Sequence, residues 1–217
     1  FRRVLFRSLT CAMRPASALS ADGPANLRDA LACAVDGGAL AWAQAGQPVL
    51  VVAAGEVHSA AAVRKAHAYQ VHAFSSAPAG PVAWVEEGRL RWAQRLPQQV
   101  VVKNAVPLPP LPWPWVEVVT SHAGARAEGV DALVAAGVRG LVVAGTGNGT
   151  VHAAWLPALQ RARAAGVPIV RTTRCAEGRI VQALGQDDAE VVDLPPLKAR
   201  ISLMLRCMSP SVPGPSP

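Results

Sequence analysis

A continuous run of apolar, mainly β-branched residues lies early in the chain, at Pro48–Ala54, with the sequence PVLVVAA. Gly46 and Gly55 bound it, and apolar and polar positions do not alternate within it. A short unbroken run of this kind is typical of a strand that is buried on both faces of a parallel sheet. We therefore predict a central strand here.

The segment before this strand has helical periodicity. Residues Pro24–Val35 follow Asp22, a favourable N-cap residue, and proline suits the first turn of a helix. The apolar residues expected to share one buried face are Leu27, Ala30, Leu31 and Ala34. Farther along, the Glu87-Gly88 pair inside AWVEEGRLRWA predicts a β-hairpin. A helix followed by a buried strand indicates α/β construction.

The second half of the chain alternates strand and helix patterns more regularly. The predicted order is strand, helix, strand, helix, strand and final helix, at Val116–His122, Arg126–Ala136, Gly140–Gly145, Val151–Ala165, Pro168–Thr173 and Pro195–Leu205. This βαβαβ order predicts a small parallel sheet with right-handed crossovers.

A proline-rich stretch, VPLPPLPWPW at Val106–Trp115, separates these two halves. Five prolines in ten residues stop both helices and central strands and favour an extended conformation. We interpret it as a semi-rigid linker, with a ligand for an SH3-type domain as the alternative.

Composition narrows the function classes. The 217 residues are 51% apolar and 16% charged, which is typical of a globular chain. The net charge of +7 would permit nucleic-acid binding, but only Arg2, Arg3 and Arg7 crowd together, so a solvated surface is favoured. The longest apolar runs fall far short of the ~20 residues of a membrane-spanning helix. We expect neither nucleic acid nor membrane as a partner.

Cysteine and histidine spacing favours no metal site. The four cysteines, Cys11, Cys33, Cys175 and Cys207, are far apart and form no Cys-x-x-Cys pair, so we expect free thiols. His67 and His72 are five residues apart, which does not place two imidazoles on one helix face. We expect no metal and no cofactor.

Two segments at the ends of predicted strands carry candidate chemistry. In AGTGNGT, at Ala144–Thr150, glycines alternate, whereas a dinucleotide fingerprint needs Gly-x-Gly-x-x-Gly; a nucleotide site at Gly145–Thr150 is therefore a weaker alternative. Asn148 could present its amide to a polar substrate there, or belong to a purely structural turn. Lys65 follows the buried strand in apolar surroundings, where partial desolvation would make its amine usable as a base, although an exposed lysine is commoner.

Several blocks, in order, resemble the bacterial-type L-asparaginases. AMRPASALSADGPANL, residues 12–27, resembles the segment after a central strand in that family. The Glu-x-His, Val-Arg-Lys, Phe-Ser-Ser and GPVAWV pieces that follow VLVV look like its next block. AGTGNGT resembles the glycine and asparagine loop of its C-terminal domain, and LPPLKARISLMLR, residues 194–206, is similar to its final helix. The resemblance runs from about Leu9 to Arg206.

The resemblance implies a two-domain α/β amidohydrolase. The expected fold is a truncated N-terminal parallel-sheet domain with a β-hairpin, a proline-rich linker and a smaller βαβαβ C-terminal domain. We expect residues 1–8 to be unmatched, 9–97 to be the C-terminal part of the N-terminal domain, 98–115 the linker, 116–207 the C-terminal domain and 208–217 a disordered tail. Similar enzymes form homotetramers, as dimers of dimers whose active sites combine the N-terminal domain of one subunit with the C-terminal domain of its neighbour.

The reaction that the resemblance implies is hydrolysis of L-asparagine, with L-glutamine as an alternative substrate, through a threonine acyl-enzyme. A threonine hydroxyl needs a base, and in this family a lysine and an aspartate assist a second threonine. Lys65 matches that lysine. Ala12 matches the alanine whose backbone lines the substrate pocket, and Asn148 matches the loop asparagine that reaches the neighbouring site. Either Glu177 or Glu190 would be the glutamate that the neighbour donates.

This sequence departs from the family pattern in what it lacks. The T-G-G-T-I motif with the nucleophile, the lid tyrosine and the H-G-T-D-T segment occur upstream of AMRP in the family and nowhere in these 217 residues. Cys11 replaces the usual glycine before AMRP, and the Ala-Ala-Gly-Glu turn replaces a more typical Asn-Asp. We therefore expect a C-terminal fragment that is inactive alone.

Overall fold

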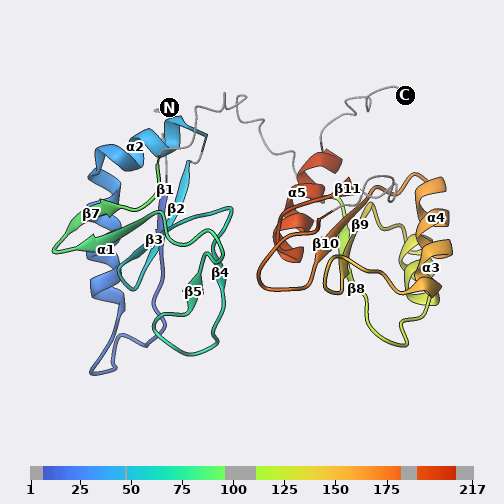
Figure 1. Ribbon diagram of the computed structural model, residues 1–217, viewed down its shortest axis with the longest axis horizontal. Helices are drawn as coiled ribbons and strands as arrows, with labels where there is room; N and C mark the ends of the chain where they lie inside the picture. The colour runs from blue at the N-terminus through green and yellow to red at the C-terminus, as the bar shows by residue number, and fades with distance from the viewer. Residues whose placement is uncertain (1–6, 47, 96–110, 182–189, 209–217) are drawn as a thin grey trace. The chain divides into compact units, whose positions relative to one another are not determined.

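The computed structural model describes residues 7–46, 48–95, 111–181 and 190–208, in two compact units, residues 1–105 and 106–217 (Figure 1). Each unit has its own sheet with helices packed on it, which confirms the α/β class. Residues 96–110, which hold most of the expected linker, lie outside the described residues, as do residues 209–217 of the expected disordered tail. The finer domain limits stay predictions.

The first unit is built on a five-stranded sheet with the order β1-β2-β3-β6-β7, beside a two-stranded ribbon, β4-β5. Its elements are β1 (Arg7–Thr10), α1 (Gly23–Val35), α2 (Gly37–Gln44), β2 (Val49–Ala53), β3 (Glu56–Ser59), β4 (Arg64–Lys65), β5 (Phe74–Ser75), β6 (Ala83–Glu86) and β7 (Arg89–Trp92). The expected parallel pairing joins β1 to β2. The β2–β3, β3–β6 and β6–β7 pairs are antiparallel, so the described sheet is mixed.

Two tight turns produce two of the three antiparallel pairs, β2–β3 and β6–β7. The predicted hairpin β6–β7 is confirmed, and both of its turn residues have positive φ, 48° at Glu87 and 72° at Gly88. The β2–β3 hairpin turns in the same way through Ala54 (φ 52°) and Gly55 (φ 76°). Such turns match the twist of the flanking strands. The sequence analysis missed β3 because alanine rarely adopts positive φ and gives no turn signal.

Helix α1 covers one side of this sheet, and the β4–β5 ribbon lies on the other (Figure 1). Ala30 and Cys33 of the helix are buried against Leu50, Val52 and Val57. The predicted buried face is wrong for its two leucines, because Leu27 is 55% and Leu31 is 61% exposed. The face that meets the sheet is rotated toward residues 26, 29, 30 and 33, so an apolar stripe on α1 stays exposed.

Helix α2 begins at a position that its sequence, Asp-Gly-Gly, does not favour for a helix. The Asp36 carboxylate caps it, accepting hydrogen bonds from the amides of Gly38 at 2.8 Å and Ala39 at 3.2 Å. The Trp92 indole N–H donates to the same carboxylate oxygen at 3.1 Å. A Cβ at Gly38 would collide with the Trp92 ring, so the glycine permits this close approach.

The second unit has the predicted βαβαβ order. Its elements are β8 (Val116–Thr120), α3 (Glu128–Ala135), β9 (Gly140–Gly145), a short 3-10 turn η1 (Ala153–Trp155), α4 (Leu156–Ala164), β10 (Ile169–Thr173), β11 (Glu190–Val191) and α5 (Pro196–Met208). All three strand pairs of the sheet, whose order is β11-β10-β9-β8, are parallel. Strand β11 was not predicted. The second predicted helix of this unit, Val151–Ala165, consists in the structure of η1 followed by α4.

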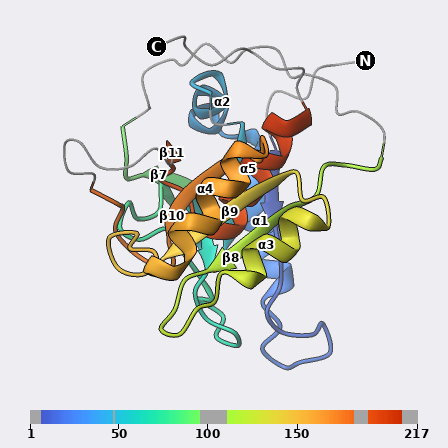
Figure 2. The same cartoon turned by 90° about the vertical axis from the view of Figure 1, so that its right-hand side faces the viewer.

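The central strand β9 is buried on both faces, which explains its unbroken apolar run. Helices α3 and α4 cover one face of the sheet, and α5 covers the other (Figures 1 and 2). Leu141 and Val143 pack in the core with residues of α3 and α4, whereas Val142 packs in the core with residues of α5. Helices α3 and α4 both end in the sequence Ala-Ala-Gly-Val. Gly137 and Gly166 have positive φ there, and the amides of Val138 and Val167 return to carbonyls of the last helical turn.

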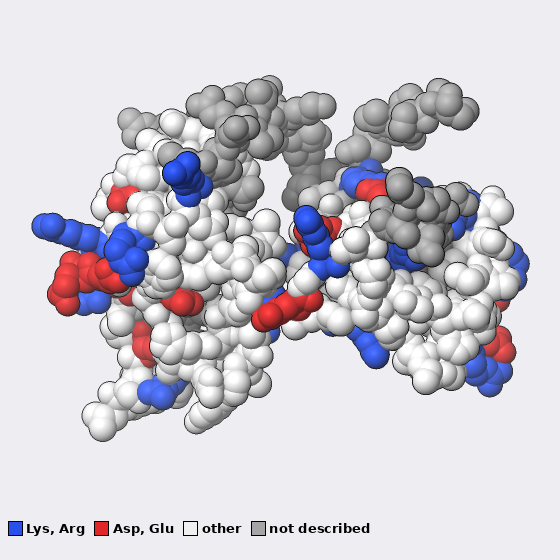
Figure 3. Space-filling view, in the orientation of Figure 1, with Lys and Arg blue, Asp and Glu red and all other residues white. Residues whose placement is uncertain are grey.

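The exposed charges are mixed on the face drawn in Figure 3, where basic side chains lie beside acidic ones instead of in one basic patch. Arg91 pairs with Glu86 at 2.7 Å, and Arg161 with Asp131 at 2.6 Å. None of the helices in the described part of the chain has the length and apolar character that crossing a membrane requires.

Candidate active site

The first candidate site lies where β1 and β2 end. The two strands are parallel and in register, with Thr10 beside Val52, so their carboxyl ends meet at one edge of the sheet. The Thr10 hydroxyl donates to the Val52 carbonyl at 2.8 Å, which ties the two ends together. Ligands of α/β sheets bind at this edge. Cys11 and Ala12 therefore leave the sheet at the position where a ligand site is expected.

The Asn26 side chain of α1 holds these strand ends in place. Its amide nitrogen donates to the Cys11 carbonyl at 2.9 Å and to the Asp22 carboxylate at 3.0 Å. Its amide oxygen accepts from the Ala54 backbone N–H at 2.9 Å, at the positive-φ residue of the β2–β3 turn. Asn26 is 3% exposed, so the whole amide lies inside the unit. The sequence analysis missed Asn26. The signal that could have identified it is a polar residue one helical turn before Ala30, on the same face of the predicted helix.

Asp22 orders the segment that follows Cys11. Its carboxylate accepts the backbone N–H groups of Met13 at 2.9 Å and Arg14 at 2.9 Å. These hydrogen bonds, that of Met13 foremost, lower the pKa of the Asp22 carboxyl. The predicted N-cap role is therefore only partly right, because Asp22 occupies the N-cap position of α1 but its side chain makes no cap hydrogen bond. It positions the Ala12–Arg14 backbone instead.

Lys65 lies in the first unit, within electrostatic range of this segment. Burial is the main cause that raises the pKa of the Cys11 thiol; the negative charge of Asp22 raises it further, and the positive charge of Lys65 opposes both. The structure thus places Ala12 and Asp22 together at the carboxyl end of β1, and Lys65 near enough for its charge to act on the Cys11 thiol. Lys65 itself is exposed on β4, so the partial desolvation expected from its apolar neighbours is not found.

The second candidate site, in the other unit, is the loop that follows β9. Thr146 and Thr150 pair across it, and Gly145 lies so close to Gly149 that a Cβ there would be 2.5 Å from the Gly149 carbonyl carbon. A Cβ at Gly149 would collide with Ile180. Close packing therefore explains Gly145 and Gly149, whereas Gly147 has open space around it and a positive φ of 47°.

The Asn148 amide is engaged at both ends. Its nitrogen donates to the Val181 carbonyl at 2.8 Å, and its oxygen accepts the Val181 N–H at 2.7 Å. Thr173, at the end of β10, donates its hydroxyl to the Gly147 carbonyl at 2.7 Å. These hydrogen bonds fix the loop to the end of β10 and the segment that follows it. Asn148 and Lys65 belong to separately described units, and their joint use in one site stays a prediction.

The two candidate glutamates differ in their surroundings. Glu190 begins β11, pairs with Val170 near the start of β10 and forms an ion pair with Arg206 at 2.7 Å. Glu177 follows the carboxyl end of β10, the end at which Thr173 and the Asn148 loop lie. Within the described ranges, no group of three or more histidine, cysteine or acidic residues is arranged to hold a metal ion.

Comparison with known proteins places both units in one family. The model "Asparaginase, N-terminal" matches residues 8–98, and the model "Glutaminase/Asparaginase C-terminal domain" matches residues 115–210. A glutaminase-asparaginase of Pseudomonas fluorescens biotype A is 36% identical over an alignment of 206 residues. This alignment covers 89% of this chain and 54% of that protein. A probable periplasmic L-asparaginase of Haemophilus influenzae is 32% identical and is covered to 57%, with 91% of this chain matched.

A solved structure agrees with these matches. The probable cytoplasmic L-asparaginase of Campylobacter jejuni superimposes with a TM-score of 0.78 at 31% identity, over 91% of this chain and 63% of that one. The chain thus spans a little over half the length of the curated relatives that it matches. Since both family models match in order and cover nearly all of the residues, the chain belongs to the glutaminase/asparaginase family.

Proposed function

We propose that this chain supplies one part of an L-asparaginase active site, which hydrolyses L-asparagine to L-aspartate and ammonia through a threonine acyl-enzyme. The observation that carries the proposal is the match of both asparaginase domain models, in order, to a chain whose Ala12 follows the carboxyl end of β1 and whose Lys65 charge acts on the adjacent Cys11 thiol. The relatives include both a probable L-asparaginase and a glutaminase-asparaginase, which supports L-glutamine as an alternative substrate.

In the proposed mechanism each residue of the chain has a distinct role. The Lys65 amine helps to deprotonate a threonine hydroxyl, and its exposure leaves it accessible to such a partner. The Ala12 backbone, held by Asp22 and Asn26, lines the substrate pocket. Asn148 acts from the C-terminal unit by fixing the loop after β9.

We propose further that residues 1–217 do not catalyse this reaction alone, because they contain neither the T-G-G-T nor the H-G-T-D-T motif. Without a nucleophile the covalent step is lost. The purified chain should therefore release ammonia from L-asparagine no faster than a heat-denatured sample. Turnover above that background, sensitive to Lys65→Met, would contradict the claim and place a nucleophile within these residues.

A fusion tests the role of Lys65 directly. The part of the Pseudomonas fluorescens relative that this chain does not cover would be joined ahead of Leu9. Positioned general bases contribute roughly 10²–10⁴-fold to rate. In an active fusion we expect Lys65→Met to lower kcat at least 100-fold. Lys198→Met, which removes a lysine from α5, is the matched control and should leave kcat unchanged. Equal rates in both variants would refute the assignment.

The proposal includes assembly into homotetramers. Leu27 and Leu31 form an exposed apolar stripe with Val35, which is 86% exposed, on α1. One edge of β1 is unpaired within the described sheet. Surfaces of this kind are normally covered by protein. Light scattering on the active fusion should give four times the mass of one chain, and a monomer that retains activity would contradict the assembly.

The nucleotide-binding alternative uses the loop Gly145–Thr150. It gains no support from the loop, because Gly149 is packed on Ile180 and Asn148 is clipped to Val181. Saturable binding of ATP or NAD that is lost in Asn148→Ala would favour this alternative over the amidohydrolase.

A further inference from the structure

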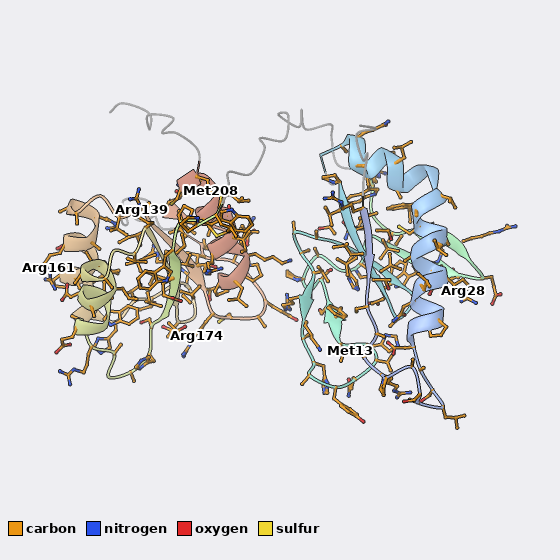
Figure 4. All side chains as sticks on the ribbon, turned by 180° about the vertical axis from the view of Figure 1, so that it is seen from behind. Met13, Arg28, Arg139, Arg161, Arg174 and Met208 are labelled. Atoms are coloured by element: carbon orange, nitrogen blue, oxygen red, sulfur yellow. The ribbon has the colours of Figure 1, made fainter. Side chains whose placement is uncertain are left out.

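A groove of about 830 Å³ lies in the second unit, where β9 and β10 begin. The ends of α3 and α4 form one wall of it, with the turns at Gly137 and Gly166, and the last turns of α5 form the other. The sheet edge that carries the Asn148 loop is the opposite one, because β9 and β10 are parallel and the loop follows their carboxyl ends. Figure 4 shows Arg139 and Met208 at one end of the unit and Arg174 at the other.

The groove has an aliphatic floor. Val134, Val138, Val167 and Leu203 line it, and no aromatic side chain is among its described lining residues. Val138 is 3% and Leu203 is 2% exposed, so these side chains are fixed by the cores on either side of the sheet. Its volume lies within the roughly 300–1,000 Å³ of small-molecule sites. The described lining is polar and apolar in about equal parts, so it suits an alkyl chain that carries a polar head group, and it offers no aromatic ring on which a nucleobase could stack.

Two guanidinium groups lie on the rim. Arg139 and Arg206 both line the groove, as does Cys207, whose thiol donates to the Arg139 carbonyl at 3.4 Å. Burial raises the pKa of this thiol, and the positive charges of Arg206 and Arg139 oppose that rise. Arg206 is paired with Glu190 at 2.7 Å. For Arg139 the structure gives no carboxylate partner among the residues that it describes. Among the described residues, the guanidinium of Arg139 is thus the positive charge on the rim that has no carboxylate partner.

We propose that this groove is a second ligand site, separate from the amidohydrolase site, which binds a small aliphatic monocarboxylate. The carboxylate pairs with Arg139, and the alkyl chain lies over Val138, Val167 and Leu203. Guanidinium groups bind carboxylates through two parallel hydrogen bonds, which suits a ligand of one negative charge. Inorganic phosphate, with up to about two charges and no alkyl chain, matches neither the single arginine nor the aliphatic side chains of the floor.

The ligand contacts separate this proposal from simple apolar binding. Octanoate is the probe, and octanamide, which has the same chain without the charge, is its matched comparison. Both would be titrated into the full 217-residue chain by calorimetry and by amide NMR spectra. We expect octanoate to bind at least tenfold more tightly than octanamide, with the largest shifts at Gly137 and Gly166.

Two arginine variants complete the test. Arg139→Gln should weaken octanoate binding at least tenfold, whereas Arg161→Gln, an exposed α4 arginine paired with Asp131 outside the groove, should leave it unchanged. Ala165→Trp, on the groove wall, should block binding while the amide spectrum of the sheet is kept. Equal affinity for octanamide, unchanged binding in Arg139→Gln, or tighter binding of inorganic phosphate than of octanoate would each overturn the proposal. None of these readouts depends on asparagine hydrolysis.

Discussion

The hydrogen bonds of Asn26 make the strongest single prediction about the first unit. Asn26→Leu keeps the side-chain volume and removes three hydrogen bonds, those to the Cys11 carbonyl, the Asp22 carboxylate and the Ala54 N–H. A hydrogen bond contributes about 1 kcal/mol net, and more when its former partner stays buried. We therefore expect the free energy of opening at this sheet edge to fall by about 3 kcal/mol.

Amide hydrogen exchange measures that opening at single residues. Since about 1.4 kcal/mol corresponds to a factor of ten, the Ala54 amide should exchange roughly 100-fold faster in Asn26→Leu. The amides of Met13 and Arg14 should also lose protection, because Asn26 holds the carboxylate that accepts them.

Leu31→Ala is the matched control on the same helix. Leu31 is 61% exposed and lies away from the buried face that carries Asn26. Surface substitutions of this kind usually change stability by no more than about 0.5 kcal/mol. Ala54 exchange should then stay within a few-fold of the unmodified chain. A change of less than about threefold in Asn26→Leu as well would refute the view that this side chain holds the strand ends.

Two further predictions concern stability. Gly149→Ala should destabilise the second unit by about 2 kcal/mol or more in urea titrations, through positive φ and collision with Ile180, whereas Gly147→Ala, with open space around it, should cost less. Equal losses would contradict the packing argument. Burial lowers the pKa of His58 more than the nearby Glu56 raises it, so the unfolded chain takes up the proton first. Stability of the first unit should therefore fall as pH drops below about 6.5; His58→Gln should remove that slope, and an unchanged slope would refute the assignment.

The second unit shows how much local sequence can decide. Helices α3 and α4 both end at an Ala-Ala-Gly-Val sequence. The glycine of each sequence has positive φ, which glycine adopts without strain. The strand after each turn begins with apolar residues that become buried, throughout β9 and at Ile169 and Val170 of β10. Both signals lie within a few residues of the structure they produce. The strand and helix order could therefore be predicted without knowledge of any distant contact.

The first unit was less predictable because its determinants are distant in sequence. Leu27 and Leu31 have helical spacing, yet the face of α1 that is buried is decided by Asn26 and its bonds to Cys11 and Ala54, which lie 15 and 28 residues away. Helix α2 follows a pair of glycines and forms because Asp36 caps it and Trp92 packs on it. The cap is local, but the Trp92 contact comes from 56 residues away and no local pattern predicts it, just as none predicts the partners of Asn26.

For the candidate sites, residue types were readable from the sequence, and their partners were not. The sequence, with the family resemblance, selected Ala12, Lys65 and Asn148. Only the tertiary structure showed that Asp22 accepts backbone amides ahead of its helix, that the Asn148 amide is occupied by Val181, and that Arg139 and Cys207, 68 residues apart, share one groove. Backbone conformation follows from nearby residues, whereas hydrogen-bond partners and grooves depend on which distant segments the fold brings together.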